Sequence, residues 1–271
     1  MTQYRYPILF LNHGGGPLPL LGDPQHQGLV NFLQNVCQDL PIPKSILVIS
    51  AHWEEDVASI TSAEKPGLIY DYFGFPKEAY EIEYPADGDR ELALRLGNML
   101  QQKGIQSNLD KERGFDHGMF VPLKLLYPQA NVPCVQLSLL NSMDPAKHIQ
   151  LGQAISHLRE ENIFIIGSGM SFHNLPVIFS QATDPDRRDL QFNDWLVTTC
   201  CDPNISFEAK KHRLVNWTEA PFARFCHPRE EHLLPLLVCF GAGLAYKENA
   251  QQVSHLKLFG KQVSNFLWGG K

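Results

Sequence analysis

Six of the eleven histidines in the chain lie in short turns flanked by glycine or proline, and several of these turns follow an apolar run typical of a β-strand. Imidazole is the commonest protein ligand of metal ions and the side chain that most readily moves protons near neutral pH. Because the carboxyl ends of parallel strands meet at one edge of an α/β sheet, histidines far apart in sequence can meet there. The residues in question are His13, His52, His117, His173, His227 and His232.

Two of these histidines end strong strand-like runs. His13 follows YPILFLN and precedes three glycines and a proline, which let the backbone turn sharply. His52 repeats the pattern at the end of ILVISA. Either one alone is more often a structural histidine bonded to a backbone carbonyl. Two in one parallel sheet favour a metal site.

A third ligand is expected in CHPREEHLLPLL, where His232 lies one residue inside an apolar helix. It would complete a facial set of three ligands with positions open for water, O2 or substrate. His227 is five residues away, so a helix would not present both on one face, and at most one of them binds the metal. Glu230 and Glu231 are expected to be solvated or to hydrogen-bond the ligands.

His117 and His173 follow other strand-like or glycine-rich segments, and either could act as an acid or base if it faces the metal. Asp116 is the expected partner of His117. The alternative for each is a hydrogen-bonded loop histidine. The remaining histidines lie in helical or polar contexts and are expected on the solvated surface; they are His26, His148, His157, His212 and His255.

Other catalytic motifs are weak. The GGGP turn lacks the GK[ST] of a phosphate-binding loop, and GxGxxG is not matched. GSGMS (167–171) places Ser168 second, and no GxSxG nucleophile elbow occurs, so a serine-hydrolase triad is disfavoured.

The pattern of apolar residues predicts an α/β fold with a largely parallel central sheet covered by helices on both faces, in three αβα layers. Continuous apolar runs predict buried strands over 6–12, 45–51, 132–138 and 163–169. Helical spacing predicts helices over 28–40, 89–104, 145–161, 187–200 and 232–243. Asp144 before Pro145 is a favourable helix start.

The remaining segments complete this picture. Residues 254–268, with a turn at Gly260, are expected to form a hairpin. The aromatic, proline-rich stretch 65–88 lacks periodicity and is interpreted as a binding loop, an interface or a loop packed by its own aromatics. No repeat or linker divides the chain, so a single catalytic domain over 1–271 is expected.

Composition limits the function further. The 271 residues are 44% hydrophobic and 19% charged, as in ordinary folded proteins, and the net charge of −6 argues against nucleic acid as a partner. No apolar stretch approaches the roughly 20 residues that span a membrane, and no signal cleavage site is evident, so a cytoplasmic protein without membrane association is expected. The six cysteines lack CxxC spacing and are expected to be reduced; Cys200 and Cys201 are the one adjacent pair.

Taken in order along the chain, these motifs resemble the class III extradiol ring-cleavage dioxygenases of the LigB type, and among them the 4,5-DOPA extradiol dioxygenase branch. The similar segments are NHGGGP, VISAHWE, YDYFGFPKEAYEIEYPA, GFDHGMFVPLKLLYP, PCVQLSL, GSGMSFHNL and HPREEHLLPLLVCFGA. One departure is the first turn, which reads NHGGGP where many relatives have the shorter GHGSP.

The resemblance implies that His13, His52 and His232 hold one divalent metal ion, Zn²⁺ or Fe²⁺, with His173 and His117 on the substrate side. It leaves open whether His173 is also a ligand. The implied reaction cleaves the ring of a catechol-type, DOPA-like substrate with O2 to a semialdehyde. In it, His173 takes a proton from the substrate and His117 forms a hydrogen bond. The alternatives are a zinc-dependent hydrolase and a non-catalytic metal-binding protein. A monomer and a dimer are both compatible with the sequence.

Overall fold

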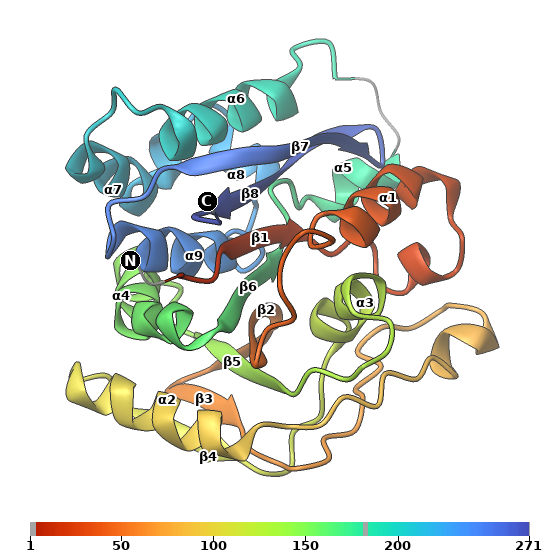
Figure 1. Ribbon diagram of the computed structural model, residues 1–271. Helices are drawn as coiled ribbons and strands as arrows, with labels where there is room; N and C mark the ends of the chain where they lie inside the picture. The colour runs from red at the N-terminus through yellow and green to blue at the C-terminus, as the bar shows by residue number, and fades with distance from the viewer. Residues whose placement is uncertain (1–3, 181–183, 271) are drawn as a thin grey trace.

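The computed structural model describes residues 4–180 and 184–270. Eight strands form one sheet in the order β4-β3-β5-β2-β6-β1-β8-β7 (Figure 1). The strands are β1 (Ile8–Asn12), β2 (Ser45–Glu55), β3 (Ala58–Thr61), β4 (Ser107–Asp110), β5 (Cys134–Leu140), β6 (Ile163–Gly169), β7 (Ala250–Leu258) and β8 (Lys261–Trp268).

The centre of the sheet is parallel. Strands β5, β2, β6 and β1 pair side by side in the same direction. They are the four predicted strands, and each is buried along most of its length, which explains their continuous apolar sequences. Antiparallel pairs flank them, because β3 runs against β5 and β8 runs against β1 and β7. The predicted α/β fold is confirmed, and β7 and β8 form the expected C-terminal hairpin.

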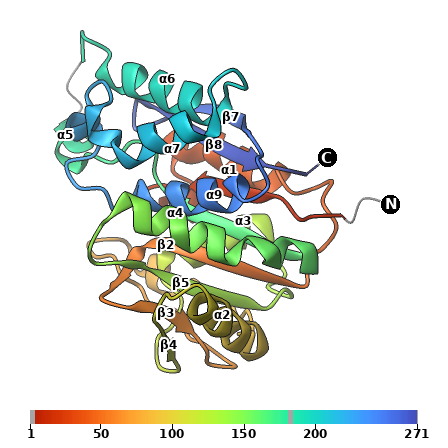
Figure 2. The same cartoon turned by 90° about the vertical axis from the view of Figure 1, so that its left-hand side faces the viewer.

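Helices cover both faces of the sheet. On one face lie α2 (Arg90–Gln102), α4 (Pro145–Ile155) and α9 (Leu234–Leu244), which stand in front of the sheet in Figure 2. On the other face lie α1 (Gln27–Asn35) and α3 (His117–Leu126), and α6 (Arg188–Cys201) packs against β7 and β8. The remaining α-helices are α5 (Leu175–Ser180), α7 (Phe207–Val215) and α8 (Ala223–Cys226).

Local sequence sets the ends of the helices. The Asp144 carboxylate accepts hydrogen bonds from the backbone N–H groups of Ala146 and Lys147, as expected of an N-cap. Helix α9 begins at Leu234, so the prediction that His232 lies inside this helix is wrong. Pro235 has no N–H to donate and therefore fits the first turn, and His232 is left in the turn before the helix.

Glycines let α4 and α9 approach closely. A Cβ on Gly152 would lie 2.0 Å from the carbonyl oxygen of Val238, and a Cβ on Gly241 would lie 2.1 Å from that of Ile149. Any larger residue at either position would have to push the helix backbones apart. Helix α9, which follows the turn that carries His232, is therefore packed closely against α4.

The irregular segment 65–88 packs partly through its own aromatic residues. The Tyr70 hydroxyl donates to the carbonyl of Ile82, and the Tyr72 hydroxyl donates to that of Ala79. Leu68 forms an isolated parallel bridge with Phe115, directly before α3. This bridge ties the segment to the start of the helix that carries His117.

Within the described ranges, no helix combines the length and the apolar character needed to cross a membrane. All six cysteines are free, in line with the expected reduced thiols, and burial raises the pKa of the Cys200 thiol well above its usual value.

Candidate metal centre

The three predicted ligands converge at the carboxyl edge of the parallel strands. His13 directly follows β1, His52 lies near the end of β2, and His232 occupies the turn before α9. The pairing of β2 with β5 shifts register between Ile49 and Glu54, an irregularity of the kind that re-aims side chains at a sheet edge. One nitrogen from each histidine falls in a group whose atoms all lie within 4.8 Å of one another.

The spacing of these nitrogens suits one metal ion. The Nε2 atoms of His13 and His52 are 3.2 Å apart. Two imidazole nitrogens, each about 2.1 Å from a shared tetrahedral ion, would be separated by about 3.4 Å. Three imidazoles are a donor set that zinc and iron both accept. The residues present therefore fit a single divalent ion.

The hydrogen bonds of His13 select the tautomer that binds metal. Its Nδ1 lies 3.0 Å from the Ser168 hydroxyl oxygen, and that hydroxyl donates its own proton to the carbonyl of Gly118. Ser168 must therefore accept a hydrogen bond from the Nδ1–H of His13. The Nε2 lone pair of His13 is then free to bind an ion.

Carboxylates face the Nδ1 atoms of the other two rings. The Nδ1 atom of His232 lies 2.9 Å from a Glu231 oxygen, and that of His52 lies 3.5 Å from an oxygen of Asp71. An ionised carboxylate only accepts hydrogen bonds, so it favours a proton on Nδ1 and a free lone pair on Nε2. This contact is consistent with the expectation that Glu231 hydrogen-bonds a metal ligand and does not itself bind the metal.

Burial keeps the three rings neutral. Desolvation, reinforced by the neighbouring histidines, lowers the pKa values of His13 and His52 well below 6.5. The same cause lowers the pKa of His232 to about 4. All three therefore keep unprotonated nitrogens at neutral pH, as metal binding requires.

His117 and His173 complete the cluster. The ring centroid of His117 lies 3.9 Å from that of His52, and the ring of His173 stacks on that of His232. Their Nδ1 atoms face the same two carboxylates, since His117 lies 2.8 Å from Asp71 and His173 lies 3.3 Å from Glu231. The structure thus brings all five predicted site residues together.

Asp71 is the site residue that sequence reasoning missed. The expected partner of His117 was Asp116, but that buried carboxylate bonds Ser50, Gln136 and Arg113 instead. Burial opposes ionisation of Asp71, yet hydrogen bonds from the His117 ring and backbone outweigh it and lower the Asp71 pKa. The one available signal was that Asp71 lies within the aromatic segment 65–88, for which a binding loop was one of the interpretations.

The other histidines lie outside the cluster. His227 is buried and donates from Nε2 to the Ser171 carbonyl, in line with the expectation that it binds no metal. The predicted surface positions of His26 and His148 are wrong, since both are fully buried. Each accepts a backbone hydrogen bond at Nε2, from Gly15 and Leu140 respectively, which satisfies the buried ring.

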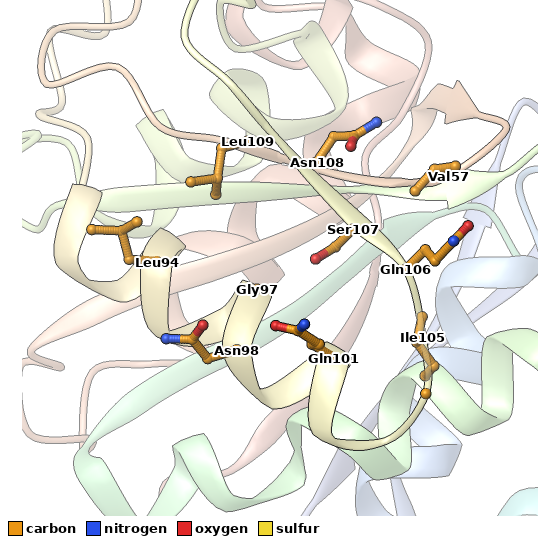
Figure 3. A pocket seen from close by; sticks show the side chains of 11 residues that line it. Val57, Leu94, Gly97, Asn98, Gln101, Ile105, Gln106, Ser107, Asn108 and Leu109 are labelled. Atoms are coloured by element: carbon orange, nitrogen blue, oxygen red, sulfur yellow. The ribbon is translucent and has the colours of Figure 1, made fainter.

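A separate groove of about 620 Å³ lies between α2 and β4, far along the sheet from the histidines (Figure 3). Its lining residues are apolar or uncharged, including Leu94, Asn98, Gln101, Ser107 and Leu109. A lining without histidine, carboxylate or thiol offers no acid, base or metal ligand. The histidine cluster is therefore the better candidate for the functional site.

Fold and site together define an α/β protein with a candidate mononuclear centre of three histidines. Comparison with protein families agrees. Residues 7–263 match the model of the catalytic LigB subunit of aromatic ring-opening dioxygenase. The chain belongs to this family.

Individual relatives extend the comparison. The chain is 38% identical to a 4,5-DOPA dioxygenase extradiol of Beta vulgaris, over 86% of this chain and 85% of the relative, and 36% identical to one of Escherichia coli K12, over 89% and 87%. It is 37% identical to the dioxygenase tasH of Hapsidospora irregularis, over 97% of this chain and 86% of that protein. The crystal structure of an uncharacterized Escherichia coli K12 protein is 31% identical and superposes with a TM-score of 0.79, covering 98% of this chain and all of that one.

Proposed function

We propose that this enzyme of the LigB family is a metal-dependent extradiol dioxygenase that opens the ring of a catechol-type, DOPA-like substrate with O2. The carrying observation is the convergence of His13, His52 and His232 beside two further histidines. The names of the relatives support the DOPA-like substrate class. The catalytic domain in this proposal comprises residues 1–271.

His13, His52 and His232 would hold the ion. A divalent ion bound there supplies Lewis acidity that favours the deprotonated catechol and, as iron(II), the redox chemistry that O2 requires. Three neutral histidine ligands would leave the ion with positions open to substrate and O2. Iron(II) is the metal we assign to turnover, because zinc cannot change its redox state.

His173 is the proposed base. Its side chain is 19% exposed, so substrate can reach the ring, and Glu231 beside Nδ1 favours a free lone pair on Nε2. Nε2 would take the proton from one catechol hydroxyl and return it later to an oxygen of the product. Ring opening then breaks the carbon–carbon bond next to the diol and leaves both atoms of O2 in the semialdehyde.

His117 is proposed to donate or accept a hydrogen bond at the substrate. It is more deeply buried than His173, and Asp71 fixes its Nδ1. Tyr72 packs against the ring edge, with centroids 5.7 Å apart. This environment holds the ring in one orientation and limits its contact with water.

The test is anaerobic loading with iron(II), followed by O2 and a panel of catechols including DOPA. We expect O2 uptake in equal amount to substrate loss, and a yellow ring-opened product. Turnover of esters or amides with zinc alone, without O2 uptake, would instead support the hydrolase alternative. Metal binding with neither activity would indicate a non-catalytic protein.

A further inference from the structure

We propose that Asp71 is a positioning residue that holds a metal ligand, His52, and a substrate-side histidine, His117, in working orientation at the same time. The inference rests on the proposed function and adds a residue outside the metal ligands and the substrate-side histidines. Asp71 connects the irregular segment 65–88 to a metal ligand and to a substrate-side histidine.

The two oxygens of Asp71 serve different rings. Oδ1 accepts a hydrogen bond from His117 Nδ1 at 2.8 Å, and Oδ2 lies 3.5 Å from His52 Nδ1. The two rings are themselves in contact, with centroids 3.9 Å apart. A single carboxylate therefore faces the Nδ1 atoms of both rings.

Asp71 also holds the start of α3. Its Oδ1 accepts a hydrogen bond from the backbone N–H of His117, at 3.0 Å. Asp116, at the N-cap position, makes no capping bond, because its oxygens bond Ser50, Gln136 and Arg113. Asp71 thus satisfies a helix N–H that the local residue leaves free.

The backbone around Asp71 is held firmly. Ile69 N–H donates to the Phe115 carbonyl and Phe115 N–H donates to the Gly67 carbonyl, both at 2.8 Å. Glycine is required at position 114, since a Cβ there would lie 2.5 Å from the Gly67 oxygen. This short pairing places Asp71 opposite the first residue of α3. The carboxylate is positioned by backbone pairing rather than by a flexible loop.

Asp71→Asn is the informative substitution. An asparagine can accept from one ring through its oxygen, but it presents N–H groups to the other ring. A ring that faces N–H groups must keep its lone pair on Nδ1 and carry its proton on Nε2. If that ring is His52, the nitrogen that faces the ion is blocked.

The first measurement is the Zn²⁺ affinity of the full chain, by competition with a chromophoric chelator. We expect Asp71→Asn to weaken it 10- to 100-fold, the usual effect of losing a hydrogen-bond partner of a ligand. The matched control is Asp87→Asn in the same segment, whose carboxylate pairs only with the exposed Lys65 among the residues described. The control should bind zinc like the wild type.

The second measurement separates the two rings. In the iron-loaded enzyme, Asp71→Asn should lower kcat for catechol cleavage. In a His117→Gln background it should still weaken zinc binding but lower kcat no further, because the contact of Asp71 with the imidazole of His117 is already gone. Asp71→Glu, which keeps a carboxylate, should recover most of the zinc affinity.

Equal zinc affinity in Asp71→Asn and wild type would overturn the inference, and so would equal losses in Asp71→Glu and Asp71→Asn. A wild type that binds zinc but cleaves no catechol with iron would overturn the proposed function instead. In that case, a selective loss of affinity in Asp71→Asn would still support the role of Asp71 towards His52.

Discussion

The rings of His173 and His232 lie stacked, with centroids 3.4 Å apart and planes inclined by 16°. One oxygen of Glu231 faces both rings, 3.3 Å from Nδ1 of His173 and 2.9 Å from Nδ1 of His232. A ring that we assign to metal binding and one that we assign to proton transfer therefore share one partner. Asp71 also faces two rings, but with one oxygen towards His117 and the other towards His52.

Substituting each residue of the stacked pair in turn should distinguish metal binding from catalysis. We expect His232→Gln to abolish stoichiometric metal binding, and His173→Gln to keep the metal but lower kcat by about 10²- to 10⁴-fold, the usual contribution of a general base. Metal analysis of both variants, together with O2 uptake, measures the difference. Equal loss of metal in the two variants would show that His173 is a fourth ligand.

Ser168 should matter for metal affinity although it does not reach the ion. Ser168→Ala removes the acceptor for His13 Nδ1–H, and we expect zinc to bind roughly 10-fold more weakly as a result. Thr199→Ala is the control, because it also removes a buried hydroxyl, but one that has no hydrogen-bond partner among residues 4–180 and 184–270. The two variants are compared by chelator competition, and similar affinities would exclude a role of Ser168 in orienting His13.

Helix packing offers a test of stability. Gly152→Ala should destabilise the protein by about 1–3 kcal/mol, the usual cost of overpacking, since its Cβ would overlap the Val238 carbonyl. Gly97→Ala in α2 is the contrasting change, because the nearest atom to a Cβ there is 3.5 Å away. Alanine at that position should stabilise the helix by about 0.5–1 kcal/mol. Urea unfolding of both variants gives the comparison.

The buried histidines should make the metal-free protein sensitive to acid. Burial lowers the pKa of His227 to about 3, against 6.5 when unfolded, so its contribution to stability is complete above pH 6.5 and is lost as the pH falls towards 3. Within that window, His227→Phe should reduce the slope of unfolding free energy against pH by up to about 1.4 kcal/mol per pH unit. Urea unfolding of wild type and variant at several pH values measures the slopes, and parallel curves would contradict the expectation.

The elements that could be predicted are those whose own residues indicate that they are buried. Strands β5, β2, β6 and β1 are covered on both faces, so their sequences are continuously apolar. Strands β3 and β4 have only four residues each, and β4 is the polar edge segment Ser107–Asp110, which forms by pairing with β3. Short edge strands of this kind carry little periodicity of their own.

The same distinction applies to the residues of the site: some are indicated by local sequence, and others depend on contacts between distant segments. The histidines His13 and His52 could be found because each follows a recognisable strand, and such strand ends meet at one edge. Asp71 could not, because its position depends on the pairing of Leu68 with Phe115, two residues far apart in sequence. The buried positions of His26 and His148 likewise depend on backbone N–H groups supplied by other segments.

The place of β1 in the sheet has a consequence for assembly. This strand, near the start of the chain, lies between β6 and β8, which are made much later. Contacts between distant segments form slowly, because a long loop must close first. His13 can therefore join His232 only after β6, which pairs with β1, and the turn at residue 232 have been synthesised. Uptake of the ion would report that these distant segments have come together.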